Sequence, residues 1–545
     1  MPACAAAPPR PAALCHRAAR LLGILFTAMF LAACGSLPPN VGRLESKALQ
    51  DPTGTRLFQG IAALMPQPST ARNDTGLRLL GNSEDAYGSR LALIQAAEKT
   101  LDLQYYSIHY DSSTEELLQR LQAAAARGVR IRILVDDFNT AGDNAEVLRL
   151  DQVPGIQVRL FNPLFGPRAS QAGRILSSLF DFNRIQQRMH NKVFIADNAL
   201  AVAGGRNLGN EYFGQGSDSN FLDLDLLVAG RLVRDLSRSF DRYWNDDLAY
   251  PVATLLTRAE REQWGAAQAQ PTPSATPDDA TQAPAPAPAP APRPVPGARD
   301  VARDILQGRM PLVWAPALLL ADKPTKIDSD DPDDPETTVV DDLLHLLGRA
   351  QRDLLIVSPY FVPGNAMMKT FSALRTRGVR VRVLTNSLAS NDAPLAHAGY
   401  ARHRKALLRL GVELYELRSH GDTRRRLFGS TPQSRASLHS KALVMDGRLL
   451  VVGSMNLDRR SALQNTELGI VVQSRALAAE LSGYLEETLD DCYRVEVTAD
   501  GRLRWHAPPD AAHPEGQVYD SEPEASTGLK LMLDLVGPFA PDEML

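Results

Sequence analysis

The sequence predicts an α/β chain built from two tandem domains of the same design. A motif of the form H-x-K-x4-D, followed by six residues and then G-[GS]-x-N, occurs at 190–207 and again at 439–456. The sequence RGVRIRIL at 127–134 is nearly copied by RGVRVRVL at 377–384. Both repeats have an offset of about 250 residues, so the duplication covers a whole domain as well as the motif.

The first domain begins near Leu77 and alternates helices with strands. We expect a helix over 86–100 and a buried strand over 101–108. An amphipathic helix over 113–127, with Ser113 or Thr114 as N-cap, leads into a strand over 129–135. This alternation is typical of an α/β domain.

The second domain repeats the same order of elements. The sequence predicts a strand over 353–358, a helix over 366–377 and a strand over 377–384. We therefore expect the two domains to have the same topology.

Composition divides the chain into six segments. An alternating Ala-Pro run marks a stiff, extended linker between the two domains. The expected segments are a signal peptide (1–33), a tether (34–75), the first domain (76–265), the linker (266–300), the second domain (301–500) and a C-terminal tail (501–545).

The N-terminus has the features of a lipoprotein signal peptide. Arginines precede an apolar run at 21–33 that is too short for a comfortable membrane span. The run ends in Leu-Ala-Ala-Cys-Gly at 31–35, which resembles a bacterial lipobox. We expect cleavage before Cys34, lipidation of that cysteine, and a location in the bacterial cell envelope facing the periplasm. An uncleaved N-terminal anchor is the alternative, and the choice between inner and outer membrane stays open.

Each motif is predicted to form a β-hairpin. Asp446-Gly447 favours a two-residue turn in the second copy. Because strand side chains alternate faces, His439 and Lys441 share one face. The two-residue turn would place Ser454 opposite His439, with Asn456 on the same face.

The same count applies to the first copy. His190 and Lys192 share a face, Gly205 lies opposite His190, and Asn207 lies beside it. Asp197 and Asp446 each lie seven residues after the motif histidine, so on a strand their side chains would point to the opposite face from the histidines. We interpret these two aspartates as turn or supporting residues that do not touch substrate.

The paired His and Lys side chains point to phosphodiester chemistry. A lysine on a buried strand face needs an anion as partner. Two such faces, related by a pseudo-twofold, would place two imidazoles and two ammonium groups in one site. The lysines and asparagines would hold the nonbridging oxygens, while one His attacks phosphorus and the other protonates the leaving alkoxide. This chemistry requires no metal and no cofactor.

The doubled motif resembles the phospholipase D superfamily over roughly residues 75 to 500. The resemblance implies two mixed β-sheets flanked by helices, related by a pseudo-twofold with the active site between them, and a covalent phosphohistidine intermediate. It implies His190 as nucleophile and His439 as acid and base. The motif residues that it marks as catalytic are His190, Lys192, Asp197, His439, Lys441 and Asp446, and those that it marks as phosphate-binding or supporting include Gly205, Asn207, Ser454 and Asn456.

Acidic partners for the histidines are expected downstream of each motif. A nucleophilic His needs its other ring nitrogen held, usually by a carboxylate. By the resemblance, Glu467 is the expected partner of His439. Asp225 is the expected partner of His190, with Asp223 and Glu211 as alternatives.

The second motif and its surroundings resemble bacterial cardiolipin synthases, in particular their C-type branch. The resemblance is carried by 454–467, 386–391, 397–400 and 410–416, and by Glu522-Pro523 and the closing residues 541–545. It implies transfer of a phosphatidyl group, with phosphatidylethanolamine as the expected donor, to the primary hydroxyl of phosphatidylglycerol. Hydrolysis of phospholipids to phosphatidic acid stays the alternative, because the motif residues are the same for both reactions.

The charge of the chain disfavours nucleic acid as a partner. Removing 1–33, which holds three arginines and no acids, changes the formal charge from −4 to −7. Nucleic-acid-binding proteins usually show a basic footprint. The expected partners are phospholipid substrates and a membrane surface, and no obligate protein partner is deducible. A nuclease or a noncatalytic lipid-binding lipoprotein is a third hypothesis, which the acidic charge and the intact His and Lys pairs disfavour.

Overall fold

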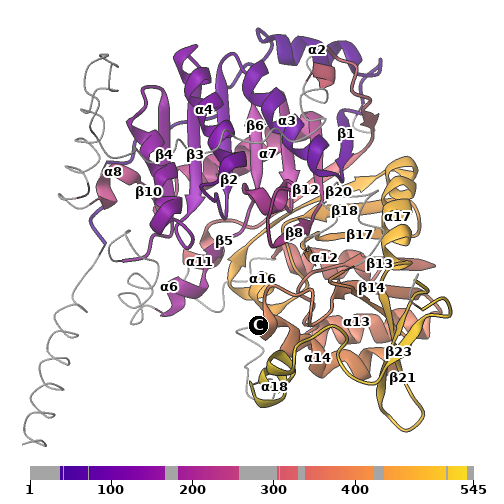
Figure 1. Cartoon of the computed structure of the whole chain (residues 1–545). Helices are drawn as coiled ribbons and strands as arrows, with labels where there is room; N and C mark the ends of the chain where they lie inside the picture. Colours follow the sequence, from indigo (N-terminus) through magenta and orange to yellow (C-terminus); the bar gives the residue numbers. More distant parts are fainter. Residues whose placement is uncertain are drawn as a thin grey trace, which may run out of the picture.

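The computed structural model describes residues 37–256, 260, 303–328, 338–420 and 435–536, apart from 41, 71, 72, 166–181, 306, 511 and 512. Two large mixed β-sheets, one in each repeat, pack side by side with helices around them (Figure 1). The predicted signal peptide with Cys34, the linker over 266–300 and the closing residues 541–545 lie outside the described residues.

The first large sheet contains nine strands. In spatial order they are β10 (Ala249–Pro251), β4 (Ile156–Phe161), β3 (Arg130–Asp136), β2 (Thr100–Tyr105), β6 (Val193–Ala196), β7 (Leu200–Gly204), β9 (Asp225–Gly230), β1 (Thr75–Leu80) and β11 (Val313–Trp314). The neighbours β2, β3 and β4 are parallel and the remaining pairs are antiparallel. The accompanying helices are α2 (Arg56–Leu64), α3 (Ser83–Ala96), α4 (Ser112–Ala126), η1 (Gly142–Gln152), α6 (Phe182–Gln186), η2 (Asn210–Tyr212), α7 (Arg231–Trp244) and α8 (Val252–Leu255).

The second large sheet repeats this order and adds a hairpin. Its strands are β12 (Ala317–Ala321), β20 (Leu468–Gln473), β18 (Leu449–Gly453), β17 (Ala442–Met445), β13 (Asp353–Val357), β14 (Arg380–Asn386), β15 (Glu413–Leu417), β21 (Tyr493–Val497), β22 (Leu503–Ala507) and β23 (Gln517–Tyr519). Again the three neighbours β13, β14 and β15 are parallel. The accompanying helices are α11 (Thr325–Asp328), α12 (Val339–Leu347), α13 (Asn365–Thr376), α14 (Pro394–Arg409), α16 (Arg459–Leu463), α17 (Arg475–Leu489) and α18 (Thr527–Val536).

The predicted helices and strands are present, with shifted ends. The helix expected from 113 is α4, and its N-cap is Asp111, whose carboxylate accepts from the Thr114 N–H. The capping box formed with Thr114 starts the helix one residue earlier than expected. The strand expected from 377 is β14, which begins at Arg380 because Gly378, with φ +81°, ends α13 first.

The two sheets share one hydrophobic core. A single cluster of buried side chains includes Leu226 and Val228 of β9 together with Val452 of β18 and Ile470 of β20. The repeats are therefore joined by apolar packing, which fixes their relative position.

The segment expected as a tether lies against the first domain. The Ala48 N–H donates to the Asp241 carboxylate of α7, and buried Arg132 donates to the Ser46 carbonyl. The Asn40 side chain donates to the carbonyl of Asp247. These contacts tie Asn40, Ser46 and Ala48 to the domain surface.

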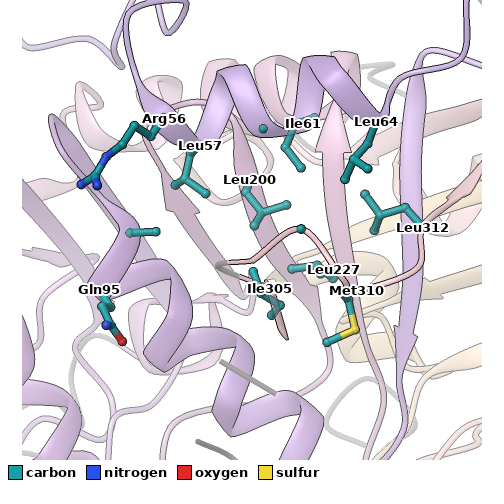
Figure 2. A pocket seen from close by; sticks show the side chains of 13 residues that line it. Arg56, Leu57, Ile61, Leu64, Gln95, Leu200, Leu227, Ile305, Met310 and Leu312 are labelled. Carbon is teal, nitrogen blue, oxygen red and sulfur yellow. The ribbon is translucent and has the colours of Figure 1, made fainter. Parts of the chain in front are cut away.

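Helix α2 covers an apolar cavity of about 350 Å³ at one end of the first sheet (Figure 2). Leu57 and Ile61 of the helix face Leu200 and Leu227 of the sheet across it. Leu200 begins β7, so the cavity lies at the opposite end of that strand from Gly204 and the motif asparagine. Among the described residues, no helix combines the length and apolarity needed to cross a membrane.

Candidate active site

The motif hairpins have three-residue turns, so the predicted register is wrong. Ala196 pairs with Leu200 in the first hairpin, and Met445 pairs with Leu449 in the second. Asp446 and Gly447 have the positive φ values expected of a tight turn, but Arg448 is added to it. The shift by one residue moves Ser454 away from the position opposite His439.

Asp197 and Asp446 have supporting roles in these turns. Asp197 accepts the backbone N–H of Lys99 and of Thr100 at 2.8 Å each. Asp446 accepts the backbone N–H of Arg352 at 2.8 Å in the equivalent place. Each aspartate ties the far end of a hairpin to the start of the neighbouring antiparallel strand, β2 or β13, away from the histidines.

Two short sheets cross the domain boundary next to the histidines. Strand β16 (Arg435–Leu438) precedes His439 and pairs with β8 (Ser219–Leu222) of the first domain. Strand β5 (Arg188–Met189) precedes His190 and pairs with β19 (Asn465–Thr466) of the second domain. The backbone N–H of each histidine extends this pairing: that of His190 donates to the Thr466 carbonyl and that of His439 to the Leu222 carbonyl, both at 2.9 Å. Each histidine thereby meets the acid that follows the strand of the other domain.

The acidic partners are exchanged between the domains. His190 Nδ1 lies 2.9 Å from Glu467 Oε2, and His439 Nδ1 lies 2.5 Å from Asp223 Oδ2. The expected pairing of Glu467 with His439 is therefore wrong, and so is the pairing of Asp225 with His190. Asp225 instead forms a buried ion pair with Arg90 at 3.0 Å.

The two alternatives for His190 have other partners as well. Asp223 contacts the histidine of the opposite domain, and Glu211 lies 2.5 Å from His109 at the edge of the site. The sequence placed an acid after each motif but carried no local signal for the exchange, because the exchange depends on the pairing of β5 with β19 and of β8 with β16.

Ser454 and Gly205 occupy equivalent positions in the two motifs, but they contact the neighbouring acidic residue differently. The hydroxyl groups of Ser454 and Ser461 donate to the Glu467 carboxylate. A Cβ atom on Gly205 would lie 2.1 Å from Asp223 Oδ1. Glycine at 205 therefore makes room for the shorter aspartate to approach His439.

Both motif lysines are buried next to the histidines. Lys192 Nζ donates to the His190 carbonyl at 2.6 Å, and Lys441 Nζ donates to the His439 carbonyl at 2.5 Å. Burial lowers the pKa of Lys441 to about 8 and lowers the pKa of Lys192 well below its ordinary value. An anion bound between them would restore the protonated forms.

The motif asparagines differ in their contacts. The Asn207 amide is engaged, since its Oδ1 accepts from the Ser107 N–H at 3.2 Å and its Nδ2 donates to the Tyr212 hydroxyl at 2.9 Å. Asn456 Oδ1 is buried and has no hydrogen-bond partner within the described part of the chain. Both asparagines line the same cavity.

A cavity of about 570 Å³ contains the two histidines and is built from both domains. Tyr106 packs edge-on against His190 at 5.1 Å, and Tyr212 packs edge-on against His439 at 5.4 Å between ring centroids. The other aromatic and charged side chains lining it include Phe138, Phe221, Tyr360, Arg188, Asp392, Asp458 and Arg460. Phe138, Tyr360 and Asp392 were not expected at the site from the sequence, and they lie on loops that only the fold brings together.

The two histidines differ in electrostatic surroundings. Burial, followed by Lys192 and Lys441, lowers the pKa of His190 well below its ordinary value. Burial and Lys441 also lower the pKa of His439, but there the Asp223 carboxylate acts in the opposite direction. Burial alone would raise the pKa of Asp223, yet His439 and Lys441 hold it below its ordinary value. By contrast, burial raises the pKa of Glu467 to about 7.

The sequence matches the family model described as "Cardiolipin synthase, PLD-like domain" over residues 91–244 and 343–489. The chain belongs to the cardiolipin synthase family of phospholipase D-like enzymes. Cardiolipin synthase C of Escherichia coli (strain K12) is 37% identical over 82% of this chain and 91% of its own length. Cardiolipin synthase A of Pseudomonas entomophila (strain L48) is 26% identical over 81% of this chain and 73% of its own length.

A solved structure supports the same fold. The phosphatidylserine synthase of Haemophilus influenzae Rd KW20 superimposes with a TM-score of 0.53 at 13% identity, covering 86% of this chain and 95% of that one. The predicted arrangement of two phospholipase D-like domains, each a large mixed sheet with flanking helices, is confirmed. The matched ranges of the family model include both motifs and Asp223 and Glu467.

Proposed function

We propose that this cardiolipin synthase-like enzyme transfers the phosphatidyl group of phosphatidylethanolamine to phosphatidylglycerol through a phosphohistidine. One observation carries the proposal. Two buried imidazoles face one cavity, and each is held at Nδ1 by a carboxylate of the opposite domain. This arrangement leaves both Nε2 atoms for chemistry on a phosphorus atom between them.

In the first step the Nε2 lone pair of His190 attacks phosphorus. The bond from phosphorus to the ethanolamine oxygen breaks, and His439 donates its Nε2 proton to that oxygen. In the second step neutral His439 takes the proton of the primary hydroxyl of phosphatidylglycerol. The glycerol oxygen attacks phosphorus, the P–N bond breaks, and cardiolipin leaves.

The electrostatics favour this division of roles. The pKa of His190 is lowered well below its ordinary value by burial and two ammonium groups, which keeps it neutral and nucleophilic. The Asp223 carboxylate beside His439 opposes the effect of burial and supports its protonated form. A bound phosphodiester anion adds to this support.

The rim of the cavity fits a cationic headgroup. Asp392 accepts the Tyr360 hydroxyl at 2.7 Å, and its carboxylate lies among aromatic side chains of the lining. A carboxylate next to aromatic faces is suited to a primary ammonium group. This supports phosphatidylethanolamine as the donor.

A cationic side chain in the lining of the catalytic cavity is suited to the acceptor lipid, phosphatidylglycerol. The Arg460 side chain lines the same cavity and donates to the Gln186 carbonyl of the first domain at 3.4 Å. Its guanidinium group is suited to the phosphate of phosphatidylglycerol. The acceptor hydroxyl would then reach the phosphohistidine from within the same cavity.

Mass spectrometry of lipid products tests the proposal. Purified protein is mixed with vesicles of phosphatidylglycerol, with and without phosphatidylethanolamine, with His190→Ala and His439→Ala variants as controls. The proposal predicts cardiolipin and free ethanolamine only when both lipids and both histidines are present. Cardiolipin and glycerol from phosphatidylglycerol alone would change the donor, and phosphatidic acid without cardiolipin would indicate a hydrolase.

We also propose that a lipid on Cys34 holds the enzyme at an envelope membrane, facing the periplasm. The support is the lipobox-like sequence at 31–35, whose Cys34 lies six residues before Asn40, and Asn40 contacts the domain surface. Metabolic labelling with a palmitate analogue should mark the wild-type chain and not a Cys34→Ser variant. Equal labelling of both chains would contradict the anchor.

A further inference from the structure

Four leucines on three helices of the second domain are unusually exposed. Leu395, Leu463, Leu531 and Leu535 have exposed fractions of 51%, 55%, 57% and 62%. They belong to helices α14, α16 and α18. Large exposed aliphatic side chains that lie together on a surface indicate contact with an apolar partner.

Contacts tie these helices to the cavity. Leu395 itself lines the cavity, and Leu463 lies three residues after Arg460, which also lines it. Helix α18 packs along α14. Figure 1 shows α18, α14 and α16 on the same side of the second domain.

Two glutamates hold the segment that leads into α18. Glu522 Oε1 lies 2.7 Å from the Nη1 atom of buried Arg404, on α14. Glu524 accepts from both the backbone N–H and the hydroxyl of Ser419, at 2.8 Å each. Ser419 follows the carboxyl end of β15, the same end of the sheet at which α14 begins. The apolar side chains of α18 are therefore held in place at the active-site end of the domain.

The volume of the cavity limits how much of a phospholipid it can hold. A volume of about 570 Å³ suits one compact ligand, so the acyl chains of two phospholipids stay outside. The lipids then remain in a bilayer while their headgroups react, and the mouth of the cavity must reach the bilayer surface.

We propose that Leu395, Leu463, Leu531 and Leu535 form a bilayer-contact surface that inserts between phospholipids at the mouth of the catalytic cavity. The inference rests on the phospholipid substrates of the proposed function. Lys530 and Asp534 are the only charged residues of α18 and their charges cancel. The contribution of α18 to the contact is therefore apolar, and it should depend little on salt.

Depth-dependent quenching tests the surface independently of activity. Leu531→Cys in the full chain is labelled with an environment-sensitive fluorophore and reconstituted into phosphatidylcholine vesicles that contain doxyl-labelled lipid. Val518→Cys is the matched control, since Val518 is 52% exposed on β23. The parent chain, labelled in parallel, gives the background of Cys4, Cys15 and Cys34, because Cys492 is buried.

We expect quenching at position 531 to exceed that at position 518 by about threefold or more, in keeping with insertion at the headgroup boundary. Equal quenching at both positions overturns the proposal. So does protection of position 531 that rises with protein concentration without lipid, which would mark contact with a second copy of the chain.

Turnover gives a second, separable test. A Leu531→Asp/Leu535→Asp variant should lose about tenfold or more of its rate on vesicles and keep its rate on a short-chain phospholipid below its micelle concentration. Val518→Asp should change neither rate. An equal loss of rate on vesicles and on the short-chain phospholipid would overturn the proposed bilayer-contact surface. If the wild-type chain makes no cardiolipin, the proposed function fails, while the quenching result still decides the surface.

Discussion

Glu467 of the second domain contacts His190 of the first, with its two carboxylate oxygens 2.9 and 3.1 Å from Nδ1. Asp223 of the first domain contacts His439 of the second in the same way. The active site is thus shared by the two domains, and neither repeat contains a complete pair of histidine and acid. The pairing of β5 with β19 and of β8 with β16 beside the catalytic residues makes this sharing possible.

The first prediction concerns the role of Glu467 in positioning. Glu467→Gln keeps the size of the side chain but removes the carboxylate that orients His190. We expect kcat to fall by on the order of 10³-fold, as for the orienting acid of other catalytic histidines. Glu211→Gln is the control, because Glu211 contacts His109 and neither motif histidine. A loss with Glu467→Gln no greater than with the control would contradict the positioning role, and the pH profile of kcat should change only in the first variant.

The second prediction concerns the space at Gly205. In Gly205→Ala the new Cβ would lie 2.1 Å from Asp223 Oδ1, so the carboxylate must move away from His439. We expect a loss of activity together with about 1–3 kcal/mol of stability.

Thermal unfolding and lipid turnover together check this steric prediction. The matched control is Gly483→Ala in α17, where a Cβ meets nothing within 4 Å. The free energy of unfolding of Gly483→Ala should rise by about 0.5–1 kcal/mol, since alanine is favoured over glycine inside a helix. Full activity in Gly205→Ala would show that the close approach is not required.

The third prediction is an alkaline limit on kcat/KM. The pKa of Lys441 in the free enzyme is lowered to about 8 by burial. As pH rises through this value, Lys441 loses its positive charge and no longer attracts the substrate phosphate, so kcat/KM should fall. Below this pH the lysine is protonated and the rate should not fall on its account.

A pH profile of kcat/KM from below 7 to above 9 checks this limit, since kcat/KM reports the free enzyme. Lys441→Arg keeps its charge throughout this range. Its residual activity should therefore lack the fall near pH 8. The same alkaline fall in both enzymes would assign it to another group.

The fourth prediction concerns the C-terminal segment. Glu522 pairs with Arg404, whose side chain is 1% exposed, so Glu522→Ala leaves a buried charge with less compensation. Because Glu416 still contacts Arg404, we expect Glu522→Ala to lower the free energy of unfolding by no more than about 3 kcal/mol. Asp520→Asn is the control, because the Arg504–Asp520 pair is solvent-exposed and should be worth less than about 1 kcal/mol.

Chemical denaturation as a function of pH checks this ion pair. Burial opposes ionisation of Glu522, but Arg404 and His397 hold its pKa at about 2, below the ordinary 4.5. The stabilisation is complete above pH 4.5 and is lost as pH falls toward 2, so wild type and variant should converge over that range. A constant difference between them across that range would contradict the ion pair.

The sequence predicted features that are repeated or local. His190, Lys192, His439 and Lys441 could be selected because both copies of the motif contain them at one spacing. The parallel strands and their helices could be predicted because segments with the apolar spacing of a strand alternate with segments that have the apolar spacing of a helix. The turn position of Asp197 could be predicted from its spacing to His190, and in the structure its carboxylate accepts the Thr100 N–H.

Features that depend on long-range pairing could not be predicted. The turn after Met445 has one residue more than its Asp-Gly signal indicates, and this residue changes the register of the hairpin. The partners of Glu467 and Asp223 depend on strands that pair across the domain boundary. Residues such as Tyr360 and Asp392 come from loops after strands, and no local pattern reveals that they meet at the cavity.

Capture of the phosphohistidine tests the two-histidine mechanism. In His439→Ala the first-step nucleophile is intact, but no group remains to activate the acceptor hydroxyl. We would incubate this variant with a phosphatidyl donor carrying a good leaving group, quench it in neutral, acid-free denaturant because the P–N bond is acid-labile, and locate any adduct by peptide mass spectrometry. We expect a phosphatidyl adduct on His190 that is absent from the His190→Ala/His439→Ala variant. An adduct on another residue, or none while the wild type makes cardiolipin, would contradict this mechanism.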